Sequence, residues 1–131
     1  MADGTRSWQP VTDPGAPAPA GAYSPVARAG HLVFVSGQVP KDPATGEIVA
    51  GDVRAQTARV LENVRLALAT AGLGLDDVVS VTAYLANADD WGEFNDVYKA
   101  TFRAPYPTRT TVGAQLRGIL VEISVIAAAK N

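Results

Sequence analysis

Residues 119–127, with the sequence ILVEISVIA, predict a β-strand that carries apolar side chains on both of its faces. Successive side chains of a strand point to opposite sides of the sheet. One side would carry Val121, Ile123 and Val125, and the other would carry Leu120, Glu122, Ser124 and Ile126. Such a strand needs cover on both sides, which restricts the chain to folds in which helices or other chains pack against each face.

The first half of the chain predicts two strands followed by a helix. Residues 23–39 indicate two strands joined by a tight turn at Gly30 and His31, and residues 40–51 form a loop rich in proline, glycine and aspartate. Asp52 would cap a helix that ends before Gly72. The apolar stripe of this helix comprises Val53, Val60, Leu61, Val64, Leu68 and Ala71.

The second half predicts a strand, a helix and two closing strands, so that the element order is ββαβαββ. Residues 78–85 would place Val79, Val81, Ala83 and Leu85 on one face of a strand. A helix is expected to begin near Asp89 or Asp90 and to end before the prolines at 105 and 107. It would bury Trp91, Phe94, Val97, Tyr98 and Phe102. The two strands that follow are expected at residues 108–114 and 119–127.

Two helices are too few to cover both faces of this sheet, so we expect both on one face of an α+β fold. The face without helices would still be apolar, because both sides of the second strand carry apolar residues, with Leu32 and Phe34 on one side and Val33 and Val35 on the other. An apolar sheet face without helices predicts an oligomer in which other copies of the chain cover it.

Composition narrows the possible functions. The 131 residues carry a net charge of −2 with a pI of about 5.2, which gives no electrostatic reason to expect a nucleic-acid partner. The chain has no cysteine and a single histidine, His31, which excludes thiol nucleophiles and clusters of thiolate or imidazole metal ligands. No apolar run reaches the roughly 18 residues that span a bilayer, and the N-terminus lacks the apolar core of a secretory signal. A soluble, cytoplasmic protein is therefore expected.

The domain organisation is expected to be simple. Residues 21–131 would form a single domain, and residues 1–20 a flexible N-terminal extension. The extension holds four prolines among alanines and glycines and has no apolar periodicity. Trp8 is the aromatic residue through which it could dock on the domain.

Two charged residues interrupt the predicted C-terminal strands. Arg109 lies among the β-branched residues of PTRTTVGA (107–114), and Glu122 lies inside the apolar run. A carboxylate there is costly to desolvate unless it is paired or hydrogen-bonded. Arg109 and Glu122 could form a cross-strand ion pair that only fixes the register of the sheet. Alternatively, Arg109 binds the anionic group of a substrate while Glu122 handles water or a proton.

Four segments together resemble the RidA/YjgF family of reactive intermediate deaminases. They are GAYSPVARAGHLVFVSGQVP, TGEIVAGDVRAQTARVLENVRLALATAGLGLDDVVSVTAYL, FNDVYKATF and PTRTTVGAQLRGILVEISVIA, and they cover about residues 21–128 in unbroken order. The resemblance is specific because the SGQ motif at residues 36–38 occurs together with the arginine-bearing segment before VEI.

The resemblance implies a chorismate-mutase-like α+β subunit that assembles into a homotrimer with active clefts between neighbouring subunits. It also implies hydrolysis of enamines and imines, such as 2-aminoacrylate and its imine tautomer, to a 2-oxo acid and ammonia, without a cofactor or a metal. The expected partners are then a small imine or enamine that bears a carboxylate, and further copies of the chain, with no nucleic acid and no membrane.

The site residues implied by the resemblance are carried over position by position. Arg109 would grip the substrate carboxylate, for which a planar guanidinium is well suited, and Glu122 would orient the attacking water and pass a proton. The remaining cleft residues would be Tyr23, Ser36, Gly37, Asn95 and Thr111. Thr111 stands where the best-known branch of the family has a cysteine, which would alter the range of substrates. For Asn95 and Tyr23 a structural role, as a hydrogen bonder and in interface packing, stays open.

Two other functions remain as alternatives. The same cleft could serve a non-catalytic binding module that captures a small carboxylate as a sensor or holdase, for which Arg109 is needed but Glu122 is not. Nuclease or translation-inhibitor activity has also been attached to this family, and the acidic pI disfavours it.

Overall fold

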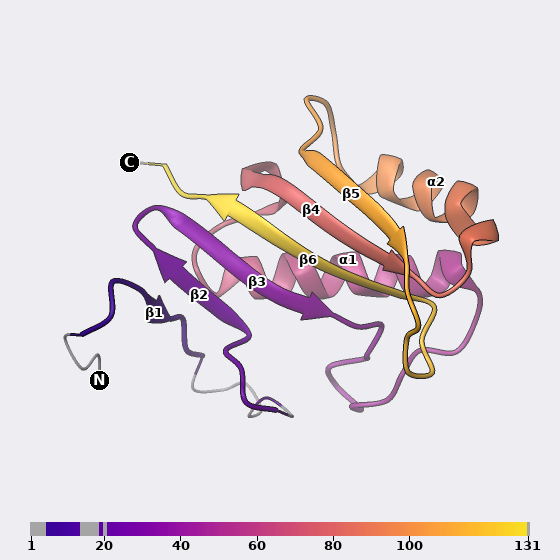
Figure 1. Cartoon of the computed structure of the whole chain (residues 1–131), viewed down its shortest axis with the longest axis horizontal. Coiled ribbons are helices and arrows are strands. Elements are labelled where there is room, and N and C mark those ends of the chain that lie inside the picture. Colours follow the sequence, from indigo (N-terminus) through magenta and orange to yellow (C-terminus); the bar gives the residue numbers. More distant parts are fainter. Residues whose placement is uncertain (1–4, 14–18, 20, 131) are drawn as a thin grey trace.

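A computed structural model describes residues 5–13, 19 and 21–130, which form a six-stranded sheet and two α-helices (Figure 1). The strands are β1 (Gln9–Pro10), β2 (Val26–Ala29), β3 (Leu32–Gln38), β4 (Val78–Leu85), β5 (Thr108–Gly113) and β6 (Val121–Ala128). The helices are α1 (Val53–Ala69) and α2 (Trp91–Thr101), and the short 3-10 helices η1 (Leu75–Asp77) and η2 (Ala88–Asp90) precede β4 and α2. Within the sheet, the strands follow the order β1-β2-β3-β6-β4-β5.

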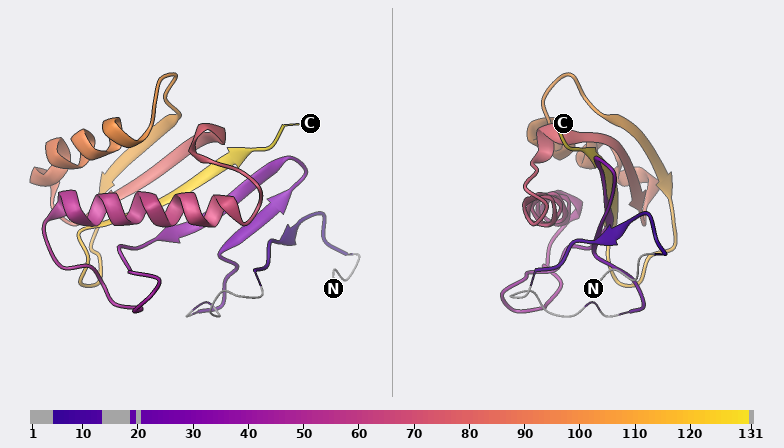
Figure 2. Two further views of the ribbon diagram at one scale, coloured as in Figure 1. Left: turned by 180° about the vertical axis from the view of Figure 1, so that it is seen from behind. Right: turned by 90° about the vertical axis from the view of Figure 1, so that its left-hand side faces the viewer.

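The sheet is mixed, because β4 and β5 are parallel while the other neighbouring strands are antiparallel. Both helices pack against the same face of the sheet, as the edge-on view in Figure 2 shows. The predicted α+β class, with two helices on one face, is therefore confirmed. The core lies between helices and sheet, where α1 contributes the stripe from Val53 to Leu68 and β6 contributes Val121, Ile123 and Val125.

Helix α1 begins and ends as its sequence predicts. The carboxylate of Asp52 accepts a hydrogen bond from the backbone N–H of Ala55 at 3.1 Å, which caps the first turn. After the helix, Gly72 adopts a φ of +76° that favours glycine, and the N–H of Leu73 donates to the carbonyl of Leu68 at 3.0 Å. The chain can therefore turn directly towards β4.

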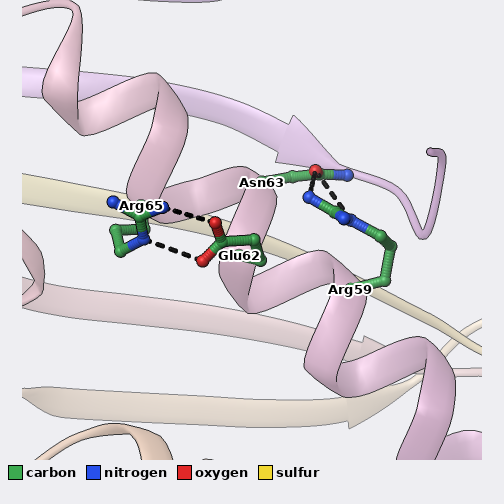
Figure 3. A network of polar contacts seen from close by, with 4 residues as sticks. All are labelled: Arg59, Glu62, Asn63 and Arg65. Atoms are coloured by element: carbon green, nitrogen blue, oxygen red, sulfur yellow. Dashed lines mark hydrogen bonds and ion pairs between the residues drawn. The ribbon is translucent and has the colours of Figure 1, made fainter. Parts of the chain in front are cut away.

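Polar side chains of α1 form two pairs, Arg59 with Asn63 and Glu62 with Arg65 (Figure 3), and Asn63 also binds the loop after β3. Arg59 donates two hydrogen bonds to the Oδ1 atom of Asn63, at 3.1 and 2.8 Å. The Nδ2 atom of Asn63 in turn donates to the carbonyls of Val39 and Lys41, at 2.9 and 2.8 Å. On the next turn Arg65 pairs with Glu62, and this hydrogen bond lowers the pKa of the Glu62 carboxyl. Asn63 thus fixes the end of β3, which carries part of the predicted site.

Two side chains do not lie as predicted, since Val79 does not share the buried face of Val81, Ala83 and Leu85, and Trp91 is not buried. Val79 is 49% exposed because the pairing of β4 with β6 shifts between Val78 and Ser80, so that Val78 takes the buried position. Trp91 is 44% exposed because it is the first residue of α2. The rest of the predicted stripe of α2 is buried or partly buried against the core.

Part of the N-terminal segment lies against the sheet edge. Gln9 and Pro10 form β1 and pair with Arg28 and Ala27 of β2, and the N–H of Val11 donates to the carbonyl of Val26 at 2.9 Å. Residues 1–4, 14–18 and 20 of the predicted extension lie outside the described residues, and the flexibility of residues 1–20 stays a prediction. In the described part of the chain, neither helix combines the length and the apolar character needed to cross a membrane.

The face of the sheet opposite the helices is open, and it exposes apolar side chains beside the hydroxyl groups of Ser80, Thr82 and Ser124. Leu32 and Phe34 of β3 are 38% and 40% exposed, and Val112 of β5 is similarly exposed. Ile126 of β6 pairs with Phe34 on this face. The prediction of an uncovered apolar sheet face is confirmed for the single chain, while the oligomer that would cover it stays a prediction.

Candidate functional site

Arg109 projects from β5 towards α2. The register of the parallel strands pairs Arg109 with Val81 and Thr111 with Ala83, and both β4 residues are buried under the helices. The Nη1 atom of Arg109 donates a hydrogen bond to the Oδ1 atom of Asn95 at 2.8 Å. The Cζ atom lies 4.6 Å from the ring centroid of Tyr98 and 5.6 Å from that of Phe94. The guanidinium is therefore held by one amide and two aromatic rings, all from α2.

No carboxylate of the described residues pairs with Arg109. A hollow of about 360 Å³ opens beside it, and its lining residues are Asn95, Tyr98, Lys99, Tyr106, Pro107 and Arg109. The lining contains two cationic side chains and no acidic one, so this hollow is suited to an anion. Two positions beyond Arg109 on the same side of β5, the hydroxyl of Thr111 is covered and has no hydrogen-bond partner within the described chain.

Glu122 projects from β6 to the opposite face of the sheet. It pairs with Tyr84 and alternates with Val121 and Ile123, both of which are buried under the helices. Its carboxylate has no ion-pair or hydrogen-bond partner in the part of the chain that the structure describes. It lies over the backbone of Gly37, where an added Cβ atom would be 2.2 Å from Oε2. Gly37 is therefore required for the present position of this carboxylate.

The pairing of β3 with β6 is irregular around Gly37, next to the carboxylate of Glu122. The pairing of β3 with β6 shifts between Val35 and Gln38, which is a β-bulge at residues 36 and 37. The hydroxyl of Ser36 donates to the carbonyl of Ser24 at 2.7 Å, and the N–H of Ser36 donates to the carbonyl of Pro25. These bonds hold the segment before β2, with the half-exposed Tyr23, next to the bulge.

The structure thus divides the seven predicted site residues into two groups. We call Asn95, Arg109 and Thr111, on the helix side of the sheet, the arginine group. We call Tyr23, Ser36, Gly37 and Glu122, on or beside the open face, the glutamate group. The alternative of a cross-strand ion pair between Arg109 and Glu122 within the chain is wrong, because β4 lies between their strands and they face opposite sides.

Sequence reasoning missed two residues that position these groups. Buried Gln56 of α1 accepts a hydrogen bond from the N–H of Leu120 at 2.8 Å and donates to the carbonyl of Val49 at 3.0 Å, so it anchors the chain just before Glu122. The sequence signal that could have identified Gln56 is a polar residue on the apolar face of a helix, because a buried amide needs hydrogen-bond partners. Tyr98 was predicted as a core aromatic only, and nothing in the sequence alone indicated its contact with Arg109.

The pKa of the Tyr98 phenol is raised, because burial disfavours the phenolate more than the nearby charge of Arg109 favours it. The phenol therefore remains neutral beside the guanidinium at neutral pH. Among the described residues, no three histidine, cysteine, aspartate or glutamate side chains gather in a way that could hold a metal ion.

The fold and these two groups define a small α+β protein with an arginine beside a cationic hollow near one sheet edge, and with a glutamate on the open face that has no partner among the described residues. The family model described as Endoribonuclease L-PSP matches residues 14–129. The chain therefore belongs to the endoribonuclease L-PSP family, which is the RidA/YjgF family that its sequence resembles.

Three known proteins illustrate the relationship. A RutC family protein of Pyrococcus horikoshii is 44% identical over 114 residues, which cover 86% of this chain and 90% of that protein. A protein of Dermatophagoides farinae named 2-iminobutanoate/2-iminopropanoate deaminase is 35% identical over 103 residues, which cover 79% and 80% of the two chains. The crystal structure of E. coli TdcF with bound serine has a TM-score of 0.84 at 35% identity and covers 93% of this chain and 99% of its own.

Proposed function

We propose that this protein hydrolyses reactive imines and enamines of 2-amino acids to 2-oxo acids and ammonia, in sites formed between neighbouring copies of a homotrimer. The observation that carries the proposal is that Arg109, held by Asn95 and Tyr98 on one face of the sheet, and Glu122 on the other face have no ion-pair partner among the described residues. The name of the Dermatophagoides farinae relative and the serine bound to TdcF support the substrate class.

The separation of the two groups is the reason for placing the site between chains. Within one chain, Arg109 and Glu122 cannot act on the same small molecule, because the sheet lies between them. The open face needs cover in any case, since it exposes Leu32, Phe34 and Val112. A neighbour that covers this face of one copy with its β5 edge would bring its own arginine group to the glutamate group.

In the proposed reaction, Arg109 binds the substrate carboxylate through its planar set of donors, and the imine carbon is thereby fixed near Glu122 of the neighbouring copy. Glu122 accepts a proton from a water molecule as the water oxygen bonds to that carbon and the C=N double bond becomes single. The proton then passes to the nitrogen, the C–N bond breaks and ammonia leaves. The added hydroxyl loses its proton as the carbonyl of the 2-oxo acid forms.

The other residues would support this chemistry. Asn95 orients Arg109, Gly37 leaves room for the Glu122 carboxylate, and the backbone near Ser36 forms the wall. Tyr23 would close the cleft from the segment before β2, and Thr111, whose hydroxyl is covered in the single chain, would contact the substrate after rotation of its side chain. These groups perform general acid–base catalysis with no cofactor in the proposal, because a protonated imine already reacts with water.

Mixing two inactive variants tests the arrangement between chains. Arg109→Ala should lower kcat/KM by about 30- to several thousand-fold, which corresponds to ~2–5 kcal/mol for a charge-assisted contact. Glu122→Gln should bind a carboxylate but lose turnover. If the two variants are denatured together and refolded, about a quarter of the sites in random trimers would combine an intact arginine with an intact glutamate. Release of 2-oxo acid, from imines made in situ by an amino-acid oxidase, should return to that extent.

The control is a mixture of Glu122→Gln with Glu122→Ala, which lacks an intact glutamate in every site and should stay inactive. A mixture of the first pair that also stays inactive, although it forms mixed trimers, would refute the site between chains. The non-catalytic binding module remains the rival, since a carboxylate receptor needs only Arg109. It would be favoured if wild-type protein binds small carboxylates but turns over no imine, and if Glu122→Gln binds as well as wild type.

A further inference from the structure

The side chain of Tyr98 has no assigned role, yet it makes the closest aromatic contact with Arg109. The Cζ atom of Arg109 lies 4.6 Å from the centroid of the Tyr98 ring, within the range in which a ring face attracts a guanidinium. Asn95 holds the Nη1 atom from the preceding turn of the same helix. An arginine side chain has many rotamers, and these two contacts together restrict the guanidinium in both position and plane.

The surroundings of the ring make it a rigid support. Tyr98 is 4% exposed, and its ring packs against Phe102 with a centroid distance of 4.6 Å and against Phe94 with a distance of 5.8 Å. Phe94 and Tyr98 lie four residues apart in α2, so they share one face of the helix. The whole stack moves only if α2 moves, and Arg109 rests on it.

The phenol hydroxyl makes no hydrogen bond within the described part of the chain, although it is covered by protein. A phenol is neutral at neutral pH even with its ordinary pKa, and burial raises the pKa of this one further, so the ring leaves the positive charge of Arg109 available to a ligand. The contact with Arg109 therefore depends on the ring and not on the hydroxyl.

We propose that Tyr98 is a positioning residue whose aromatic ring, together with the amide of Asn95, holds the Arg109 guanidinium in its carboxylate-binding orientation before the ligand arrives. The ligand class rests on the proposed function, whereas the orientation of Arg109 does not. Pre-organisation of this kind increases affinity because fewer rotamers are lost on binding. Loss of the ring should therefore raise KM more than it lowers kcat.

The test compares Tyr98→Phe, which keeps the ring, with Tyr98→Leu, which removes it, in the full-length chain. Leu61→Ala is the matched control, because it removes buried apolar atoms from α1, whereas the groups that hold Arg109 lie on α2. NMR signals of the Arg109 guanidinium report its position directly, since protons above a ring face are shielded. Imine turnover per folded protein, and binding of pyruvate followed by the same signals, are measured in parallel.

We expect Tyr98→Phe and Leu61→Ala to keep the shielded guanidinium signals and a kcat/KM per folded protein within about two-fold of wild type. Tyr98→Leu should lose the shielding and lower kcat/KM about 5- to 30-fold, mainly through KM. The inference is overturned if Tyr98→Leu keeps wild-type signals and affinity, or if Tyr98→Phe falls as far as Tyr98→Leu. If wild type turns over no imine, the deaminase proposal fails, while the NMR signals and pyruvate binding still decide the role of Tyr98.

Discussion

Replacing Gly37 by alanine should abolish most turnover while leaving the fold intact. A Cβ atom at this position would lie 2.2 Å from Oε2, 3.0 Å from Cδ and 3.2 Å from Cγ of Glu122. Real Cβ contacts essentially never fall below 3.0 Å, so the nearest carboxylate oxygen has to move by about 0.8 Å or more. Because the neighbouring atoms Cδ and Cγ are also crowded, the whole carboxylate group must turn away from its present place.

The magnitude follows from this displacement. A misplacement of about 1 Å in a catalytic group can lower the rate about 100-fold, which corresponds to ~2.7 kcal/mol in the activation free energy. The free energy of unfolding should change by less than about 1 kcal/mol, because the displaced group is the end of a flexible side chain and Gly37 has no positive φ. The melting temperature should therefore stay close to that of wild type while kcat falls.

The assay is release of 2-oxo acid from imines made in situ, with thermal melts of the same samples. Gly74→Ala is the control, since a Cβ atom at Gly74 meets no atom within 4 Å and its φ is −132°. In the Glu122→Gln background, Gly37→Ala should lower activity no further, because both changes remove the same function. A Gly37→Ala protein with wild-type kcat would refute the assignment of Glu122 as the base.

Two further changes test the open face and the buried phenol. Phe34→Glu places a charge from every copy in the expected interface, so sedimentation should show monomers of this variant. Wild type and the control Phe34→Leu should show about three times the 13.6 kDa chain mass. A stable Phe34→Glu trimer would contradict an assembly through this face. The raised pKa of Tyr98 gives stability that is present below pH ~10 and lost as the pH rises through the folded-state pKa, because the unfolded chain ionises this phenol first. Chemical unfolding at pH 8 and pH 11 should therefore show wild type losing more stability than Tyr98→Phe, and equal losses would mean that the phenol is not effectively buried.

Much of the fold could be predicted because local signals agreed with the tertiary structure. The alternation in β6 correctly placed Val121, Ile123 and Val125 on one side of the strand, and the structure shows that this side is the buried one. The aspartate cap and the glycine after α1 fixed the bounds of that helix to within two or three residues. Where a local pattern was interrupted by tertiary structure, the prediction was wrong. At Val79, the irregular pairing of β4 with β6 interrupts the alternation of buried and exposed side chains. No residue type in that strand indicates this irregularity.

The arrangement of the site could be predicted only in part. Alternation within a strand says which residues share a face, but it does not say which face of β5 corresponds to which face of β6. That relation depends on β4, which is inserted between them and is parallel to one and antiparallel to the other. The sequence therefore left open whether Arg109 and Glu122 lie on the same side. The contact of Tyr98 with Arg109 depends on the same long-range packing of α2 against β5.

The short β1 strand has a consequence for aggregation. A free strand edge presents backbone N–H and C=O groups that can template further strands, and β1 covers that edge of β2 with only two residues. One of the two is Pro10, which has no N–H and cannot continue a hydrogen-bonded ladder outwards. The N-terminal segment thus ends the sheet in a form that other chains cannot extend. A chain shortened to Gly21 would keep its core but expose the edge at Ala27 and Arg28, and it would become prone to edge-to-edge association at high concentration.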